Sequence, residues 1–176
     1  GEGVNGITES GGWVTPFLID HEDGNIMFVG YKNIWRSTNI KSGSTSTVQW
    51  KKISSMNNSD MNVMAQSRAN TSILYVASGN KLWYTENAKD NEVNWTSRTS
   101  NLPLPNTITA LETSYLDENV VYMAQQTRIY KSEDKGASWT EITANLSGNQ
   151  INTIALYKNA QDAIYIGTNV GVFYKD

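Results

Sequence analysis

Residues 72–87 read SILYVASGNKLWYTEN, two short apolar runs separated by Gly79 and Asn80. Each run is only about five residues long and rich in apolar and aromatic side chains, which is the pattern of a short β-strand. Gly and Asn between two such runs favour a tight turn. The stretch therefore predicts two neighbouring strands.

The same arrangement occurs four times along the chain, with a period in the mid-forties. The other copies are 25–39 (NIMFVGYKNIWRSTN), 119–134 (NVVYMAQQTRIYKSED) and 163–176 (AIYIGTNVGVFYKD). An aromatic residue falls in register in every copy, at Phe28, Tyr75, Tyr122 and Tyr165. Apolar pairs also align, at Ile34-Trp35, Leu82-Trp83, Ile129-Tyr130 and Val172-Phe173. A fourfold repeat at one spacing indicates a repeat architecture.

Each copy is expected to form an inner strand, two central strands and an outer strand that begins at a recurrent tryptophan. Repeats of about 40 to 45 residues with four strands are typical of β-propeller blades. We therefore predict an all-β chain of four-stranded antiparallel blades, with three full blades and a partial fourth. Residues 1–176 are expected to be a single propeller unit or a propeller fragment, with blades at approximately 13–55, 60–101, 106–146 and 150–176.

The segment 132–139, SEDKGASW, follows the third strand of the third copy. Asp134 can accept backbone N–H bonds within a turn that Ser132 opens, Gly136 supplies a backbone angle that other residues resist, and Trp139 can bury its ring. The pattern S-x-D-x-G-x-x-W resembles the Asp-box, the BNR repeat of sialidases and related propellers. The first two copies carry degenerate versions in longer loops, with Ser37, Asn39, Trp50 and with Thr85, Asn87, Trp95.

This resemblance covers nearly the whole chain, but it is to a superfamily with many activities. Asp-box propellers include sialidases, xyloglucan-active glycoside hydrolases, sortilin-type receptors, photosystem assembly factors, lectins and large secreted bacterial proteins. The resemblance implies a bacterial protein that is extracellular or on the cell surface. It does not select an activity, because one fold carries many functions.

Composition excludes several classes of partner. The net charge is −3 and charged residues make up 18% of the chain, so we expect no nucleic-acid and no membrane binding. The apolar runs are far shorter than the ~20 residues of a membrane-spanning helix. The absence of cysteine excludes disulfides and thiolate chemistry. The chain begins at Gly1 rather than Met, so we expect a processed or excised piece.

No catalytic residue, metal or cofactor is expected. The four arginines do not form the pattern of a sialidase. Asp20 and Glu112, near the ends of inner strands, are the nearest approach to a glycosidase carboxylate pair, and turn chemistry explains them better. The segment 20–25, DHEDGN, gathers three carboxylates around His21, but a polar turn accounts for it without an ion.

Trp13 is the candidate ligand contact, because the other copies have Asp60, Thr107 and Gln150 at its position. It lies just before an inner strand, at the end where propellers usually bind ligands. The neighbouring loop 8–12, TESGG, adds Glu9 as a second candidate. An exposed indole beside polar groups is suited to stacking on a sugar ring.

Three and three-quarter blades raise the question of how the ring closes. The favoured interpretation is a fragment of a six- to eight-bladed ring, whose remaining blades would cover the apolar end faces. A closed four-bladed ring would need residues 3–7, GVNGI, as the outer strand of the last blade. Self-association of two copies into one ring is the third possibility.

Together these observations predict a non-catalytic extracellular binding or scaffold module, with a polysaccharide or glycan as its ligand. One alternative is part of a secreted glycoside hydrolase of the Asp-box type, with catalytic carboxylates partly outside this chain. A further alternative is a sortilin-like protein-binding module.

Overall fold

The computed structural model describes residues 5–56, 59–146, 148–158 and 162–175. The first sheet contains β1 (Phe17–Ile19), β2 (Met27–Gly30), β3 (Ile34–Ser37) and β4 (Lys51–Lys52). The second contains β5 (Val63–Gln66), β6 (Leu74–Ser78), β7 (Lys81–Thr85) and β8 (Thr96–Ser97). The third contains β9 (Ile108–Thr113), β10 (Val121–Gln125), β11 (Arg128–Ser132) and β12 (Thr140–Glu141). The fourth contains β13 (Ile151–Tyr157), β14 (Ala163–Thr168) and β15 (Val172–Lys175). Two short 3₁₀ turns, η1 (Thr99–Asn101) and η2 (Ala144–Leu146), follow β8 and β12.

Each sheet is an antiparallel meander in which neighbours in sequence are neighbours in space. The stretch 72–87 forms the β6–β7 hairpin, with Tyr75 opposite Tyr84 and Ser78 opposite Lys81. Gly79 sits at the turn with a φ of +59°, a backbone angle that glycine adopts without strain. The predicted all-β fold of four-stranded antiparallel blades with a partial fourth is confirmed.

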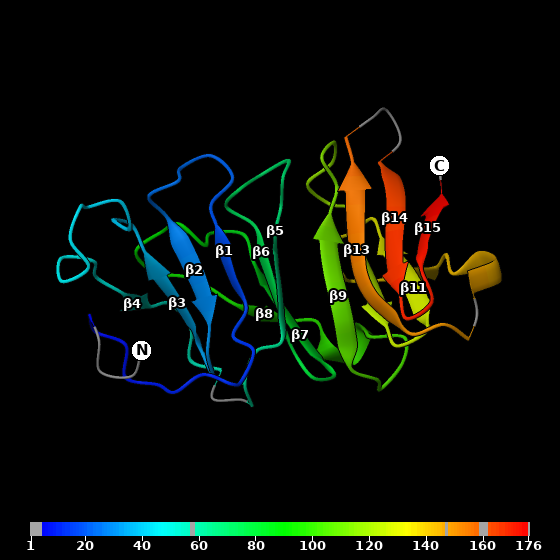
Figure 1. The fold of residues 1–176 in the computed structure, drawn as a ribbon, viewed down its shortest axis with the longest axis horizontal. Helices are drawn as coiled ribbons and strands as arrows, with labels where there is room; N and C mark the ends of the chain where they lie inside the picture. Colours follow the sequence, from blue (N-terminus) through cyan, green and yellow to red (C-terminus); the bar gives the residue numbers. More distant parts are fainter. Residues whose placement is uncertain (1–4, 57–58, 147, 159–161, 176) are drawn as a thin grey trace.

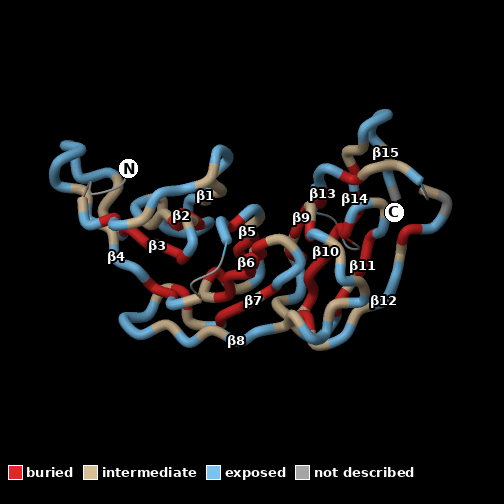
Figure 2. The backbone as a smooth tube through the Cα atoms, turned by 90° about the horizontal axis from the view of Figure 1, so that it is seen from below, coloured by how far each residue is buried: buried red, intermediate tan, exposed pale blue. Residues whose placement is uncertain are grey.

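The four sheets follow one another along an arc (Figures 1 and 2). The inner strands β1, β5, β9 and β13 pack successively side by side, and the strands β4, β8 and β12 lie on the opposite, outer side. The first sheet and the fourth sheet stand at opposite ends of the arc (Figure 2). The described part of the chain therefore forms an open sector rather than a closed ring.

The N-terminal segment does not complete the fourth sheet. The carbonyl oxygen of Asn5 accepts a hydrogen bond from the N–H of Trp50 at 3.0 Å, and Ile7 is buried. Trp50 immediately precedes β4, so this segment lies against the first sheet. A closed four-bladed ring with GVNGI on its last blade is thus not the arrangement seen, although residues 3 and 4 of that stretch lie outside the described residues.

Apolar side chains form a separate core cluster in each space between two sheets. Phe28 of the first sheet clusters with Leu74 and Val76 of the second. Tyr75 clusters with Val121 and Met123 of the third, and Tyr122 with Ile164 and Ile166 of the fourth. The strands β6 and β10 are buried on both faces because each lies between two other sheets.

Candidate functional site

The SEDKGASW segment forms a compact turn between β11 and β12. The hydroxyl of Ser132 donates to Oδ1 of Asp134 at 2.8 Å and accepts the N–H of Gly136 at 2.8 Å. The Asp134 carboxylate also accepts the N–H of Ser138 at 2.8 Å and the Ser138 hydroxyl at 2.6 Å. The Ser138 hydroxyl bond is the main cause that lowers the pKa of Asp134. All these bonds stay within the turn, so the carboxylate is occupied in holding its own loop together.

Gly136 and Trp139 couple this turn to the core. Gly136 has a φ of +80°, and a Cβ placed there would lie 3.3 Å from the Trp139 ring. The half-buried Trp139 ring packs against the cluster between the second and third sheets. Its Nε1 atom is buried without a hydrogen-bond partner in the described structure, so the ring contributes by packing.

The first degenerate turn keeps the same bonding plan despite its longer loop. The hydroxyl of Ser37 donates to Oδ1 of Asn39 at 3.1 Å, and the same Oδ1 accepts the N–H of Gln49 at 3.0 Å. Gln49 precedes Trp50, as Ser138 precedes Trp139. The amide of Asn39 then donates to the carbonyl of Thr47 at 2.9 Å, a bond that a carboxylate could not make.

The second degenerate turn repeats this geometry. The hydroxyl of Thr85 donates to Oδ1 of Asn87 at 2.8 Å, and that oxygen accepts the N–H of Asn94 at 2.9 Å. The Asn87 amide donates to the carbonyl of Glu92 at 2.8 Å. Trp95, next in sequence, donates from Nε1 to the carbonyl of Ile53, the residue after β4, at 2.7 Å. Asn replaces Asp where the loop presents a carbonyl to the side chain, so these turns are structurally equivalent.

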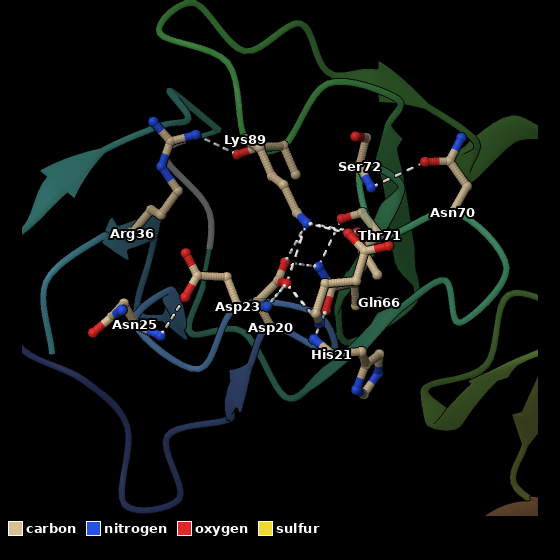
Figure 3. A network of polar contacts seen from close by, with 12 residues as sticks. Asp20, His21, Asp23, Asn25, Arg36, Gln66, Asn70, Thr71, Ser72 and Lys89 are labelled. Atoms are coloured by element: carbon tan, nitrogen blue, oxygen red, sulfur yellow. Dashed lines mark hydrogen bonds and ion pairs between the residues drawn. The ribbon is translucent and has the colours of Figure 1, made fainter. Parts of the chain in front are cut away.

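Asp20 stands at the centre of a polar network that links the first and second sheets (Figure 3). Its Oδ1 accepts the N–H groups of Glu22 at 2.9 Å and Asp23 at 2.8 Å. Its Oδ2 accepts the Nε2 of Gln66 at 2.6 Å, and Gln66 in turn accepts the N–H of His21 at 3.1 Å. Burial raises the pKa of Asp20, but these hydrogen bonds outweigh it and leave the pKa below its usual value. The carboxylate is therefore held ionised.

Lys89 completes the network from the β7–β8 loop (Figure 3). Its ammonium lies 3.0 Å from Oδ2 of Asp20, 3.1 Å from the Glu22 carboxylate and 2.6 Å from the Thr71 hydroxyl. Burial lowers the pKa of Lys89, but the bonds to Asp20 and Glu22 outweigh it and raise the pKa. Sequence reasoning missed Gln66, Thr71 and Lys89, because no local pattern marks partners that lie dozens of residues from Asp20.

Asp20 and Glu112, the two carboxylates considered for acid chemistry, are both engaged in polar contacts within the protein. Glu112 on β9 pairs with Arg68, in the loop after β5, at 3.4 Å. Within the described residues, no group of three or more His, Cys, Asp or Glu side chains is placed to hold a metal ion. Burial lowers the pKa of His21, the only histidine, and nearby Arg68 lowers it further.

Trp13 and Glu9 lie in one loop but have opposite environments. The Trp13 side chain is fully exposed and Val14 beside it is exposed as well. Both carboxylate oxygens of Glu9 are used: Oε1 accepts Nδ2 of Asn33 at 2.7 Å, and Oε2 accepts the N–H of Asn33 at 3.0 Å and Nε1 of Trp35 at 3.3 Å. Glu9 therefore anchors the loop on the first sheet, and Trp13 projects from it.

A scan against protein-family models and a search of curated proteins find no match for this sequence. Among solved structures, an ancestral GH74 enzyme has a TM-score of 0.70 at 16% identity, over 95% of this chain and 23% of that one. A GH74 enzyme of Niastella koreensis has a TM-score of 0.66 at 14% identity, over 90% of this chain and 22% of that one. The protein U3-55K has a TM-score of 0.57 at 8% identity, over 90% of this chain and 50% of that one.

At these identities the likeness concerns the fold alone. The chain spans less than a quarter of the length of either GH74 enzyme. None of the helical segments among its described residues is long and apolar enough to cross a membrane. The sheet order, the arc of inner strands and these neighbours together identify the chain as an all-β, partial β-propeller.

Proposed function

We propose that this chain is a non-catalytic carbohydrate-binding module of an extracellular bacterial protein, with Trp13 as its main contact to a polysaccharide. The observation that carries the proposal is the fully exposed indole of Trp13 on a loop that is otherwise tied down. Exposure of a large aromatic ring to water is unfavourable, and such exposed rings are typical of binding surfaces, where they supply rigid contact area.

The loop around Trp13 is held on both sides. Before it, Glu9 binds Asn33 and Trp35. A Cβ at Gly11 would lie 2.8 Å from the Tyr31 ring, so Gly11 lets the backbone pass close to that ring. After it, the carbonyl of Pro16 accepts the N–H of Gly30 at 2.9 Å. A platform that is ordered before the ligand arrives loses less entropy on binding.

We propose a non-catalytic module because of the surroundings of Asp20 and Glu112, the two carboxylates considered for acid catalysis. A general acid needs a pKa near the working pH, whereas the pKa of Asp20 is lowered. Glu112 is engaged in an ion pair with Arg68 at 3.4 Å. Asp20 is therefore not suited to protonate a leaving group, and the Glu112 carboxylate is already paired with a cation.

The second candidate function is part of a secreted glycoside hydrolase, and the likeness to two GH74 enzymes favours it. In that case catalytic carboxylates would come from outside the residues described. Release of reducing sugar from xyloglucan or mixed-linkage β-glucan separates the two functions, because a binding module retains the polymer without cleaving it.

The test is isothermal titration of the chain with xyloglucan and with mixed-linkage β-glucan. We expect binding to at least one polymer, and at least a tenfold loss of affinity in Trp13→Ala. Trp13→Phe should retain part of the affinity because it keeps an aromatic face. Leu116→Ala, which truncates an exposed apolar side chain in another turn, serves as the matched control. Unchanged binding in Trp13→Ala would overturn the proposal.

A further inference from the structure

Two positions of the repeat are buried in the first three sheets and exposed in the fourth. The second-strand aromatics Phe28, Tyr75 and Tyr122 are at most 4% exposed, whereas Tyr165 is 42% exposed. The third-strand aliphatics Ile34, Leu82 and Ile129 are 0% exposed, whereas Val172 is 74% exposed. The first three members of each series are covered by the following sheet. The fourth sheet has the same face with nothing packed on it in the described structure.

This fourth-sheet face is apolar and aromatic over all three strands. Tyr157 lies on β13, Tyr165 on β14, and Val172 and Tyr174 on β15, and all four are exposed. Tyr165 is paired with Tyr174 across the sheet, with ring centroids 5.0 Å apart. The opposite side of the same sheet, with Ile154, Leu156, Ile164 and Ile166, is buried against the third sheet. The fourth sheet is therefore built like an internal blade.

The first sheet presents the complementary half of the same interface. At each internal interface, the repeated aromatic clusters with two aliphatic residues that flank the next aromatic in sequence. In the first sheet these two residues are Met27 and Val29. Their cross-strand partners on β1 are Ile19 and Phe17, which are 49% and 65% exposed. Val29 is already buried and Met27 is half-buried, so the open part of this half consists of Phe17, Ile19 and Met27, which we call the first-sheet face.

We propose that the fourth-sheet face of one copy binds the first-sheet face of a second copy, head to tail, so that two chains close one ring. Each chain carries both halves of an interface that it already forms three times internally. Two such contacts related by a twofold axis bury both end faces of both chains. The resulting eight sheets are within the 4 to 8 blades found in propellers.

The N-terminal segment is compatible with this docking. Glu9 binds Asn33 and Trp35, and the carbonyl of Asn5 binds Trp50, so the segment lies over the outer part of the first sheet. It leaves Phe17 and Ile19 on the inner strand open.

Sedimentation velocity of the chain without any sugar is the first measurement, over a range of micromolar concentrations. We expect a species with twice the 19.6 kDa mass of one chain. A monomer at all concentrations would overturn the proposal, and so would species larger than a dimer, because a twofold ring leaves no free face.

Charge substitutions then test the head-to-tail arrangement. Tyr165→Glu and Phe17→Glu should each weaken the dimer at least tenfold, because each places a carboxylate in one of the two faces. Both side chains are exposed in the single chain, so both variants should fold, which the thermal transition by circular dichroism verifies. Leu116→Glu, at an exposed turn residue outside both faces, should leave the dimer intact.

A mixture of the two variants distinguishes the proposed contact from a symmetric one. In the mixed dimer both substitutions fall at one interface and the other interface is unaltered, so association should recover in part. A dimer that Tyr165→Glu disrupts and Phe17→Glu leaves unchanged would show two fourth-sheet faces in contact, which overturns the head-to-tail proposal. These outcomes do not depend on whether Trp13 binds a polysaccharide.

Discussion

Gln66 of the second sheet donates its side-chain N–H to Oδ2 of Asp20 in the first sheet, at 2.6 Å. The same amide nitrogen donates to the carbonyl of Thr71 at 2.6 Å, and the Gln66 Oε1 accepts the N–H of His21. One buried side chain thus satisfies a carboxylate, a carbonyl and an N–H on two sheets. The consequence is that the first two sheets are locked together by polar bonds as well as by apolar packing.

Removal of this amide should destabilise the protein. Gln66→Ala leaves the buried Asp20 carboxylate and the Thr71 carbonyl each without one donor, which costs about 1–3 kcal/mol per unsatisfied group. We expect the free energy of unfolding, measured in urea, to fall by about 2–4 kcal/mol. Gln49→Ala, at an exposed glutamine, is the control and should change it by less than about 0.5 kcal/mol. Equal effects of the two substitutions would contradict the locking role of Gln66.

The same network predicts an acid limit to stability. The folded-state pKa of Asp20 is lower than its usual value of 3.8, so its stabilising contribution is fully present above that value. The contribution is lost as the pH falls through the folded-state pKa. Lys89 behaves in the opposite sense: its pKa is raised above 10.5, so its contribution is lost only as the pH rises beyond that value.

We therefore expect Asp20→Asn to flatten the decline of unfolding free energy between about pH 4 and pH 2. The measurement is urea unfolding across that range in both proteins. Glu92→Gln removes one exposed carboxylate and controls for the change in net charge. A decline as steep in Asp20→Asn as in the parent would show that other carboxylates dominate acid unfolding.

The turn at Asp134 depends on the absence of a side chain at Gly136. Gly136→Ala combines a positive φ of +80° with a Cβ that meets the Trp139 ring at 3.3 Å. Gly43→Ala has a similar φ of +84° but open space around the new methyl group. Both should lose about 1 kcal/mol from backbone strain, and Gly136→Ala should lose more. A comparison of their thermal midpoints isolates the contact with the ring, and equal shifts would mean that the ring moves aside freely.

Trp139 should contribute by its volume rather than by its N–H group. Its Nε1 has no hydrogen-bond partner in the described structure, and its ring packs against the cluster between the second and third sheets. Trp139→Ala should cost about 3–5 kcal/mol, as truncation of a large aromatic does. Trp139→Phe should cost clearly less. An unfolding free energy of Trp139→Ala within about 1 kcal/mol of the parent would defeat this interpretation.

The fold was readable from the sequence because its determinants are local. The apolar run LYVAS and the Gly79-Asn80 turn are set by residues that are neighbours along the chain, and the same local pattern recurs in register at Phe28 and Tyr75. Strand formation and tight turns depend on these short-range patterns. A blade is itself a meander of consecutive strands, so the repeat period alone indicated its architecture.

The polar contacts could not be predicted from the sequence, because they join residues that are distant along the chain and that only the packing of the sheets brings together. Glu9 was a ligand candidate in the sequence, and the structure shows that its carboxylate binds Asn33, just before β3, and Trp35 on β3. Asn39 looked like a loss of the motif, whereas its amide reaches the carbonyl of Thr47 across the longer loop.

By itself the sequence determined strands, turns and the number of repeats, because each of these depends on a few adjacent residues. The tertiary structure decided which faces are covered and which remain open. Tyr122 and Tyr165 occupy the same place in the repeat, yet only Tyr122 is buried, because a following sheet packs on it. Burial belongs to the arrangement of sheets in space, so identical local patterns produce a core residue in one blade and an exposed surface in the next.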